Sequence, residues 1–241
     1  MPDRKAELQA HPAISIGPCG FRFILTLMNE RRLSRSDRLL SGIGSALRGI
    51  ASTPATATRT NPATGTAEGP LTEPERRHAA ALMRVNHAGE IAAQGLYQGH
   101  AAVARSIRVA EHLQAAARDE LDHLAWCEQR LRELGARPSA LRPAWFAGAW
   151  LIGAVSGVMG DRWSLGFVEE TERQVSAHLA GHLAELPGND ARSRAIVTKM
   201  REDEERHGAE ARSAGGRPPP SIVRKLMRMS AGAMTRTSYN W

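Results

Sequence analysis

Apolar residues recur at helical spacing through most of the chain that follows Leu71. A first run extends from Glu75 to Ala104 without a proline, and Thr72 with Glu75 three positions later has the signature of a capping box. A second run ends at the sequence GARP, a typical helix stop, and keeps these apolar residues on one side: Leu113, Ala117, Leu121, Leu124, Leu131 and Leu134. The two runs, with a turn near residues 105–107, predict a pair of long helices.

A second pair of helices is predicted after a central apolar stretch. Residues 143–160 carry no charge over 18 positions, and Gly153 and Gly157 stand in GxxxG spacing. Because a membrane span usually needs about 20 apolar residues, we expect a buried central helix in preference to a spanning one. Residues 161–186 and 191–216 predict two further helices, separated by the turn sequence PGND. Aromatic residues are only 5% of the chain and β-branched residues are scattered, so the fold class is all-α.

The ends of the chain differ from this helical region. Residues 28–50 and 217–241 each predict a basic amphipathic segment suited to a membrane surface. Residues 51–70, rich in Pro, Thr and Ala, bury too little apolar surface to order themselves and predict a disordered linker. Residues 1–27 show neither a signal peptide nor a periodic pattern, and we expect translation to begin at Met28.

The charge of the chain is compatible with two kinds of partner. The net charge of +7 and the isoelectric point near 10.3 would suit nucleic acid or an anionic membrane. The positive residues fall mostly in the amphipathic terminal segments, which favours the membrane and gives no reason to expect nucleic acid. The two cysteines, Cys19 and Cys127, lack CxxC spacing, so neither a cysteine zinc site nor a disulfide framework is expected.

Glutamate and histidine repeat along the helical region in a duplicated pattern. Each half has one glutamate followed by an ExxH motif: Glu90, Glu120 and His123 in the first half, and Glu172, Glu204 and His207 in the second. The offset between halves is 82 residues for the lone glutamates (172 minus 90) and 84 for the motifs (204 minus 120). Spacing of three puts both side chains of a motif on one helix face.

This ligand set is typical of a ferritin-like four-helix bundle with two metal ions. In such bundles two helices each supply one glutamate and the other two each supply Glu-x-x-His, and four carboxylates balance two divalent cations. The sequence therefore predicts such a bundle over residues 71–216, with a metal partner for Glu90 and with small residues around Glu90 that let the helices approach. A third motif, Glu75 with His78, has no counterpart at the repeat offset, and we expect it to be a surface pair.

Several motifs resemble those of the demethoxyubiquinone hydroxylase family of di-iron monooxygenases. They are RVNHAGEIAAQGLYQGH, DELDHL, ARPS, EETERQVSAHL and DEERHG. The resemblance implies that the six residues bind two irons, Fe2+ or Fe3+, with Glu120 and Glu204 bridging them. It also places His178 near the quinone pocket, as a candidate catalytic residue.

The same resemblance implies the reaction and the surroundings of the enzyme. One oxygen atom of O2 would enter the ring of a polyprenyl methoxy-methyl-benzoquinol in ubiquinone biosynthesis. Since that substrate resides in the bilayer, we expect a peripheral protein on the cytoplasmic side of a bacterial-type cell membrane. A quinone-biosynthesis complex or a homo-oligomer is compatible with this expectation.

Two other functions stay open at this stage. A ferritin- or rubrerythrin-like iron oxidase or peroxidase would use the same ligands. Such a protein would not need the apolar central stretch or the basic C-terminal segment. A quinone-binding scaffold without catalysis is the third hypothesis, and the complete ligand set argues against it. For the neighbours of the ligands, His87, Asp119, Asp203 and Tyr97, we expect supporting, solvent-facing or core positions.

Overall fold

The structure, a computed structural model, describes Gly44 and residues 56–240. The predictions for residues 1–27, for most of the basic helix 28–50 and for a start at Met28 lie outside these residues. Within them every regular element is a helix and none is a strand, which confirms the all-α class. The helices are α3 (Glu73–Val103), α4 (Ile107–Glu133), α5 (Arg142–Gly157), α6 (Asp161–Glu185), α7 (Ala191–Ser213) and α8 (Ser221–Asn240).

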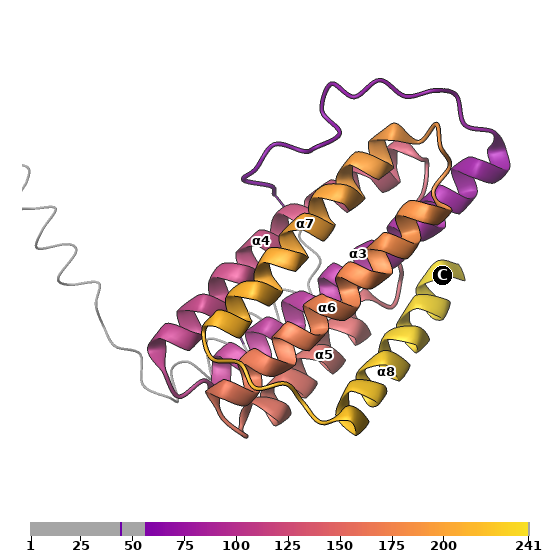
Figure 1. Cartoon of the computed structure of the whole chain (residues 1–241). Helices are drawn as coiled ribbons and strands as arrows, with labels where there is room; N and C mark the ends of the chain where they lie inside the picture. The colour runs from indigo at the N-terminus through magenta and orange to yellow at the C-terminus, as the bar shows by residue number, and fades with distance from the viewer. Residues whose placement is uncertain (1–43, 45–55, 241) are drawn as a thin grey trace, which may run out of the picture. The chain divides into compact units, whose positions relative to one another are not determined.

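Four long helices carry the predicted ligands and lie side by side (Figure 1). Helix α3 packs against α4, α6 packs against α7, and the two pairs meet where α4 contacts α7 and α3 contacts α6. Helix α5 lies along α3, and α8 crosses to contact both α3 and α6. The duplicated sequence pattern thus corresponds to two helix pairs that face each other.

The helix ends follow the signals in the sequence. Thr72 caps α3 in a complete capping box: its side chain accepts from the Glu75 backbone, and the Glu75 carboxylate accepts from the Thr72 N–H at 2.8 Å. Helix α4 stops before Gly135, whose φ of +70° is a left-handed conformation that glycine adopts without strain. The Asp161 carboxylate accepts from the backbone N–H groups of Arg105 and Ser106 in the α3–α4 turn, at 2.8 and 2.7 Å. The predicted pair of helices and the turn near residues 105–107 are confirmed.

The prediction of a buried central helix is wrong for α5. Only Phe146, Gly153 and Gly157 of this helix are buried. Leu151 and Val155 are more than half exposed, because α5 packs mainly against α3, with a smaller contact to α6, and no described helix covers its other side. Within the described residues no helix is both long enough and apolar enough to cross a membrane.

Glycines on both helices let α5 approach α3 closely. A Cβ atom at Gly95 would overlap the Phe146 carbonyl oxygen, and one at Gly99 would overlap the Trp150 carbonyl oxygen. From the other side, a Cβ at Gly153 would overlap the Leu96 carbonyl oxygen. The small residues that follow Glu90 in α3 therefore serve contact with α5, which carries none of the predicted ligands.

Substituting Gly99 with alanine is expected to destabilise the fold by about 3 kcal/mol or more, because the new methyl group must displace backbone atoms of α5. Gly148 on α5 is the matched control, since a Cβ there meets no atom within 4 Å. Gly148→Ala should stabilise by about 1 kcal/mol through helix propensity. Urea unfolding of both variants measures the difference, and equal stabilities would contradict the close packing.

The prediction of a disordered linker is wrong for residues 56–70. Thr58 and Arg59 both donate to the Asp122 carboxylate on α4, and Asn61 donates to Gln129 at 3.0 Å. Glu68 pairs with the buried Arg130. Polar contacts to the bundle supply the order that this segment's scarce apolar surface does not.

Candidate metal centre

All six predicted ligands lie buried inside the four-helix arrangement. Glu90 comes from α3, Glu172 from α6, and the two ExxH motifs from α4 and α7. Their ligand atoms form two overlapping groups, each within 4.8 Å: Glu90, Glu120, His123 and Glu204 in one, and Glu172, Glu204 and His207 in the other. The structure thus brings together every residue for which a ligand role was predicted.

The His123 imidazole faces carboxylates from three helices. Its Nδ1 atom lies 2.9 Å from Glu120 Oε2, 3.3 Å from Glu204 Oε1 and 3.5 Å from Glu90 Oε2. One nitrogen cannot donate to three oxygens at once, so a convergence of this kind suits a cation better than hydrogen bonds alone.

The His207 imidazole occupies the equivalent position in the second group. Its Nδ1 atom lies 3.2 Å from Glu120 Oε1 and 3.6 Å from Glu204 Oε2. Glu120 and Glu204 therefore each present one oxygen to each imidazole. His207 Nδ1 and Glu120 Oε1 are buried and have no well-formed hydrogen bond among the described residues, as expected of atoms whose partner is an ion.

Burial and mutual repulsion set the charges of this cluster. Burial raises the pKa of Glu90 well above its usual value, although His123 opposes the shift, and the charges of Glu120 and Glu204 add to it. Burial likewise raises the pKa of Glu172, helped by the charge of Glu204. Metal-free, these two carboxyl groups therefore keep their protons to a higher pH than ordinary glutamates do.

For the two imidazoles, the attraction of the neighbouring carboxylates outweighs the effect of burial. Burial alone would lower the pKa of His207, but hydrogen bonds to Glu120 and Glu204 and the charges of both outweigh it and raise the pKa to about 10. The pKa of His123 is also raised, since Glu120 and the bond to Asp203 overcome its burial. The metal-free centre thus holds protons where a metal ion would bind.

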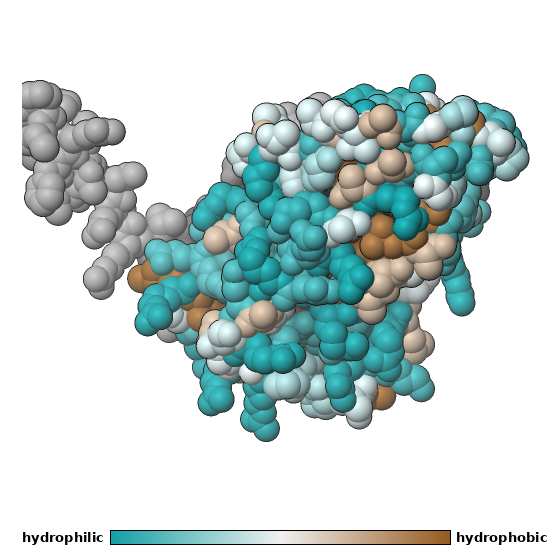
Figure 2. All heavy atoms as spheres, turned by 45° about the horizontal axis from the view of Figure 1, so that its top comes forward, coloured by the Kyte–Doolittle hydropathy of each residue, from teal (hydrophilic) through white to brown (hydrophobic). Residues whose placement is uncertain are grey.

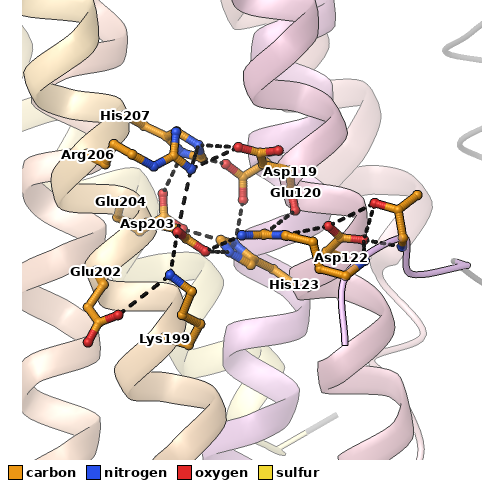
Figure 3. A network of polar contacts seen from close by, with 12 residues as sticks. Asp119, Glu120, Asp122, His123, Lys199, Glu202, Asp203, Glu204, Arg206 and His207 are labelled. Atoms are coloured by element: carbon orange, nitrogen blue, oxygen red, sulfur yellow. Dashed lines mark hydrogen bonds and ion pairs between the residues drawn. The ribbon is translucent and has the colours of Figure 1, made fainter. Parts of the chain in front are cut away.

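Two aspartates orient the imidazoles across the α4–α7 interface (Figure 3). His123 Nε2 on α4 donates to Asp203 Oδ2 on α7 at 3.1 Å, and His207 Nε2 on α7 donates to Asp119 Oδ2 on α4 at 3.1 Å. Each aspartate directly precedes the glutamate of its own motif but accepts a hydrogen bond from the histidine of the other motif. A donor bond from Nε2 leaves Nδ1 as the basic nitrogen that points into the cluster.

Sequence comparisons agree with this arrangement of ligands. The family profile described as "Ubiquinone biosynthesis protein COQ7" matches residues 77–238, more than half of the chain. The chain belongs to this family. All six buried ligands lie within the matched COQ7 range, so the resemblance found in the motifs is confirmed.

Individual COQ7-type relatives match most of the chain. A protein of Nitrosococcus oceani is 50% identical over 212 residues, covering 88% of this chain and 99% of its own. Proteins of Ralstonia pickettii and Cupriavidus taiwanensis are 53% and 56% identical, covering 88% and 84% of this chain and 99% of their own. Each of the three is named 3-demethoxyubiquinol 3-hydroxylase.

Tyr97 borders the cluster rather than serving only as core. Its side chain is buried, two turns after Glu90 on α3, and its hydroxyl donates to Glu172 Oε1. Burial and then the charge of Glu172 raise the pKa of Tyr97 well above its usual value, so the phenol stays protonated. Tyr97 therefore fixes one Glu172 oxygen, while the same carboxyl group also hydrogen-bonds to Glu204 of the cluster.

His178 is not part of either metal group. It lies on α6 six residues after Glu172, and its ring packs against that of His182 with 4.0 Å between centroids. His182 donates from Nδ1 to the Asn86 side chain at 2.7 Å. Burial lowers the pKa of His178, so the ring is neutral at pH 7. His178 Nε2 has no hydrogen-bond partner among the described residues.

The remaining histidines of interest lie outside the cluster. His87 is buried on α3 with its Nε2 3.3 Å from Glu128 Oε1, so it does not face the solvent. Glu75 is occupied in the α3 cap and His78 contacts the Tyr239 hydroxyl at 2.8 Å. The third ExxH motif is therefore not a ligand pair, as its missing counterpart indicated.

Sequence reasoning missed the specific roles of three residues near the centre. Asp119 and Asp203 repeat at an offset of 84 (203 minus 119), the same as the ExxH motifs, and that repeat would have revealed them as a matched pair. Arg59, which contacts Asp203, had no such pattern, because it lies in the segment expected to be disordered.

Proposed function

We propose that the chain is a di-iron monooxygenase that hydroxylates the ring of demethoxyubiquinol with O2, in a ferritin-like bundle. The observation that carries the proposal is the buried meeting of two imidazoles with four carboxylates, in which Glu120 and Glu204 each present one oxygen to each imidazole. The names of relatives at 50–56% identity support the substrate and the reaction.

The residues present fit two iron ions. Glu90 and His123 would bind one ion, Glu172 and His207 the other, and Glu120 and Glu204 would bridge them. Oxygen donors in excess of nitrogen suit the higher charge of oxidised iron. When bound, iron supplies the redox chemistry that activates O2. The chain holds the ligands apart from bulk water, and Tyr97 and the two aspartates fix their orientation.

His178 is proposed to contact the quinol. Its Nε2 is buried without a hydrogen-bond partner in the described part of the chain, on the same helix as Glu172. Because burial lowers its pKa, the ring is neutral and can exchange a hydrogen bond with a quinol hydroxyl. His178→Ala with intact iron content and a raised KM would support this contact.

The test of the function is product analysis with labelled oxygen. Purified iron-loaded protein, a reductant and a short-chain demethoxyubiquinol under ¹⁸O2 should yield a ring-hydroxylated quinol that carries one ¹⁸O atom. Accumulation of the demethoxy precursor in cells that lack the protein would agree. Iron storage or peroxide consumption without quinol product would instead favour the ferritin- or rubrerythrin-like alternative.

Peripheral membrane association is part of the proposal. Helix α5 exposes apolar residues at helical spacing, and α8 adds Ile222, Leu226 and Met229, each more than half exposed, among arginines and Lys225. The face drawn in Figure 2 is mainly hydrophilic, with apolar side chains in separate patches. A basic amphipathic helix and a helix with an exposed apolar face, both packed on α3, suit the surface of an anionic bilayer, here the cytoplasmic side of a bacterial-type membrane, where a polyprenyl quinol resides.

Replacing Leu151 and Val155 together with serine is expected to weaken binding to anionic vesicles by about tenfold or more, since each side chain contributes about 1.5–3 kcal/mol when fully buried. Vesicle co-sedimentation measures the change. Leu121→Ser on α4 is the control, because Leu121 is also an exposed apolar residue but belongs to neither α5 nor α8. Equal losses in both variants would argue against these helices as the membrane face.

A further inference from the structure

Arg59 joins the segment before α3 to two helices of the metal centre. Its Nε donates to Asp122 Oδ2 on α4 at 2.6 Å, and its Nη1 donates to Asp203 Oδ2 on α7 at 2.7 Å. The guanidinium therefore fastens α4 to α7 at the level of the ExxH motifs. Such a planar fork suits two carboxylates in fixed positions.

Two residues that Arg59 contacts, Asp203 and Trp126, both lie against His123. Asp203 Oδ2, which accepts from Arg59, also accepts from His123 Nε2 at 3.1 Å. The guanidinium carbon lies 4.9 Å from the Trp126 ring centroid, and that ring lies 5.3 Å from the His123 ring. The shared Asp203 carboxylate and the Trp126 ring, which is tilted by 45° against the His123 ring, thus both connect Arg59 to the same predicted ligand.

Other cations compete for Asp203. Lys199 and Arg206, both on α7 like Asp203 itself, approach its second oxygen, Oδ1, at 3.0 and 3.5 Å. On Oδ2 the described donors are Arg59 at 2.7 Å and His123 Nε2 at 3.1 Å, and Arg59 is the one that lies outside the four ligand-bearing helices. Without Arg59 the carboxylate is free to turn toward its own helix, and His123 Nε2 would lose its acceptor.

The second half of the centre is built differently. Asp119, which orients His207, pairs with Arg206 at 2.9 Å, and Arg206 directly precedes His207 on α7. Arg59 reaches Asp119 only at its backbone carbonyl, where Nη2 donates at 3.4 Å, and no described contact joins the segment 56–60 to the Asp119 carboxylate that orients His207. Arg59 therefore serves one half of a centre whose ligands are otherwise duplicated.

The segment that carries Arg59 is itself seated on α4. The Thr58 backbone N–H donates to Asp122 Oδ1 at 2.6 Å, and the Thr58 hydroxyl contacts the same carboxylate at 3.2 Å. The Arg59 backbone N–H also donates to Asp122, at 3.3 Å. Asp122 thus anchors the backbone as well as the guanidinium and limits where the guanidinium can reach.

We propose that Arg59 is a positioning residue that holds Asp203 against His123 and so sets the metal affinity of the His123 half alone. This inference rests on the two-iron centre proposed above. Outer partners of ligands typically change metal affinity 10- to 100-fold. Since Arg59 acts through Asp203, we expect about a tenfold loss in Arg59→Gln, confined to one ion.

The experiment is anaerobic Fe2+ titration of the full chain, with Mössbauer spectra of the two iron positions. Arg59→Gln is expected to weaken one ion about tenfold and to broaden or deplete one iron signal, while the second ion binds as in the wild type. Arg59→Lys keeps the charge but cannot reach both carboxylates, so a smaller loss at the same ion is expected. Arg206→Gln should instead weaken the other ion.

Arg192→Gln is the matched control. Arg192 is about as exposed as Arg59 (25% and 32%) and also forks onto a carboxylate, that of Glu133, which is not a predicted ligand. Its loss should leave both irons unchanged. If Arg59→Gln and Arg59→Lys weakened the binding of both ions equally, the proposal would be overturned. It would also be overturned if neither variant weakened the binding of any ion. Wild-type protein that binds no iron would overturn the two-iron centre as well.

Discussion

Glu204→Gln is expected to abolish quinol hydroxylation and to leave the protein unable to hold two irons. Glu204 belongs to both ligand groups, with Oε1 toward His123 and Oε2 toward His207. Glutamine keeps the side-chain volume but offers a single acceptor oxygen and no charge. The variant therefore has three carboxylates where four would balance the charge of two divalent cations. Iron content by elemental analysis and product formation measure the two effects.

The stability of the iron-free variant separates this effect from misfolding. Burial and the charge of Glu120 would raise the pKa of Glu204, but its hydrogen bonds with Glu172, His123 and His207 outweigh them and lower it, so the carboxylate stabilises the iron-free fold. The iron-free Glu204→Gln protein should therefore unfold at a lower temperature than the iron-free wild type, but still in one cooperative transition. Glu205→Gln is the control, because Glu205 is exposed on α7 and pairs with Arg201 and Ser176. It should keep both irons and full activity. An active, two-iron Glu204→Gln protein would rule out the bridging role.

Raising the pH from 6 to 8 is expected to act in opposite directions on iron-free and iron-loaded protein. His207 has a folded pKa of about 10 against an ordinary 6.5, so its stabilisation is complete below pH 6.5 and is lost as the pH rises toward 10. Glu90 and Glu172, with pKa values raised above 4.5, add a cost in the same direction once the pH exceeds their unfolded values. The iron-free protein should therefore become less stable between pH 6 and 8.

Iron binding should respond with the opposite sign. The protonated ligands must lose their protons before a metal ion binds, and each proton released makes affinity about tenfold higher per pH unit. Since His207 has a pKa of about 10 and must release its proton throughout this range, we expect affinity to rise about tenfold or more per unit. Anaerobic Fe2+ titration and urea unfolding at pH 6, 7 and 8 measure both quantities.

A histidine pair supplies the control for the pH effect. His207→Asn should flatten the pH dependence of the iron-free protein. His182→Asn should instead make the loss of stability between pH 6 and 8 slightly steeper, because burial lowers the pKa of His182 to about 3 and only the unfolded ring takes up a proton near pH 6. A pH-independent iron affinity in the wild type would contradict the protonated state of the empty ligands.

The ligands were predictable because their geometry is local. Glu120 with His123, and Glu204 with His207, share a helix face by the helical repeat alone, and the duplicated offset indicated that the faces meet. The capping box of Thr72 and Glu75 is local in the same sense. Patterns of this kind depend on spacing within one helix, which any sequence displays directly.

The position of α5 was not predictable from its composition. An uncharged stretch is compatible with a core helix, a membrane span or a surface helix with one exposed apolar face. The choice depends on Gly95 and Gly99, some 50 residues earlier in the chain, which let α5 lie against one side of α3. Composition records how apolar a segment is, but not how many neighbours cover it.

The helices from Glu73 to Ser213, the six candidate ligands and the family could be predicted from the amino-acid sequence, because helical periodicity and motif spacing encode them along the chain. Other contacts became visible only in the folded protein: Asp119 and Asp203 each accept from the histidine of the other motif, Tyr97 donates to Glu172, and Arg59 contacts both α4 and α7. These contacts join residues 63 to 144 positions apart. The physical reason is that such pairings follow from how the helices pack against one another, which no local spacing specifies.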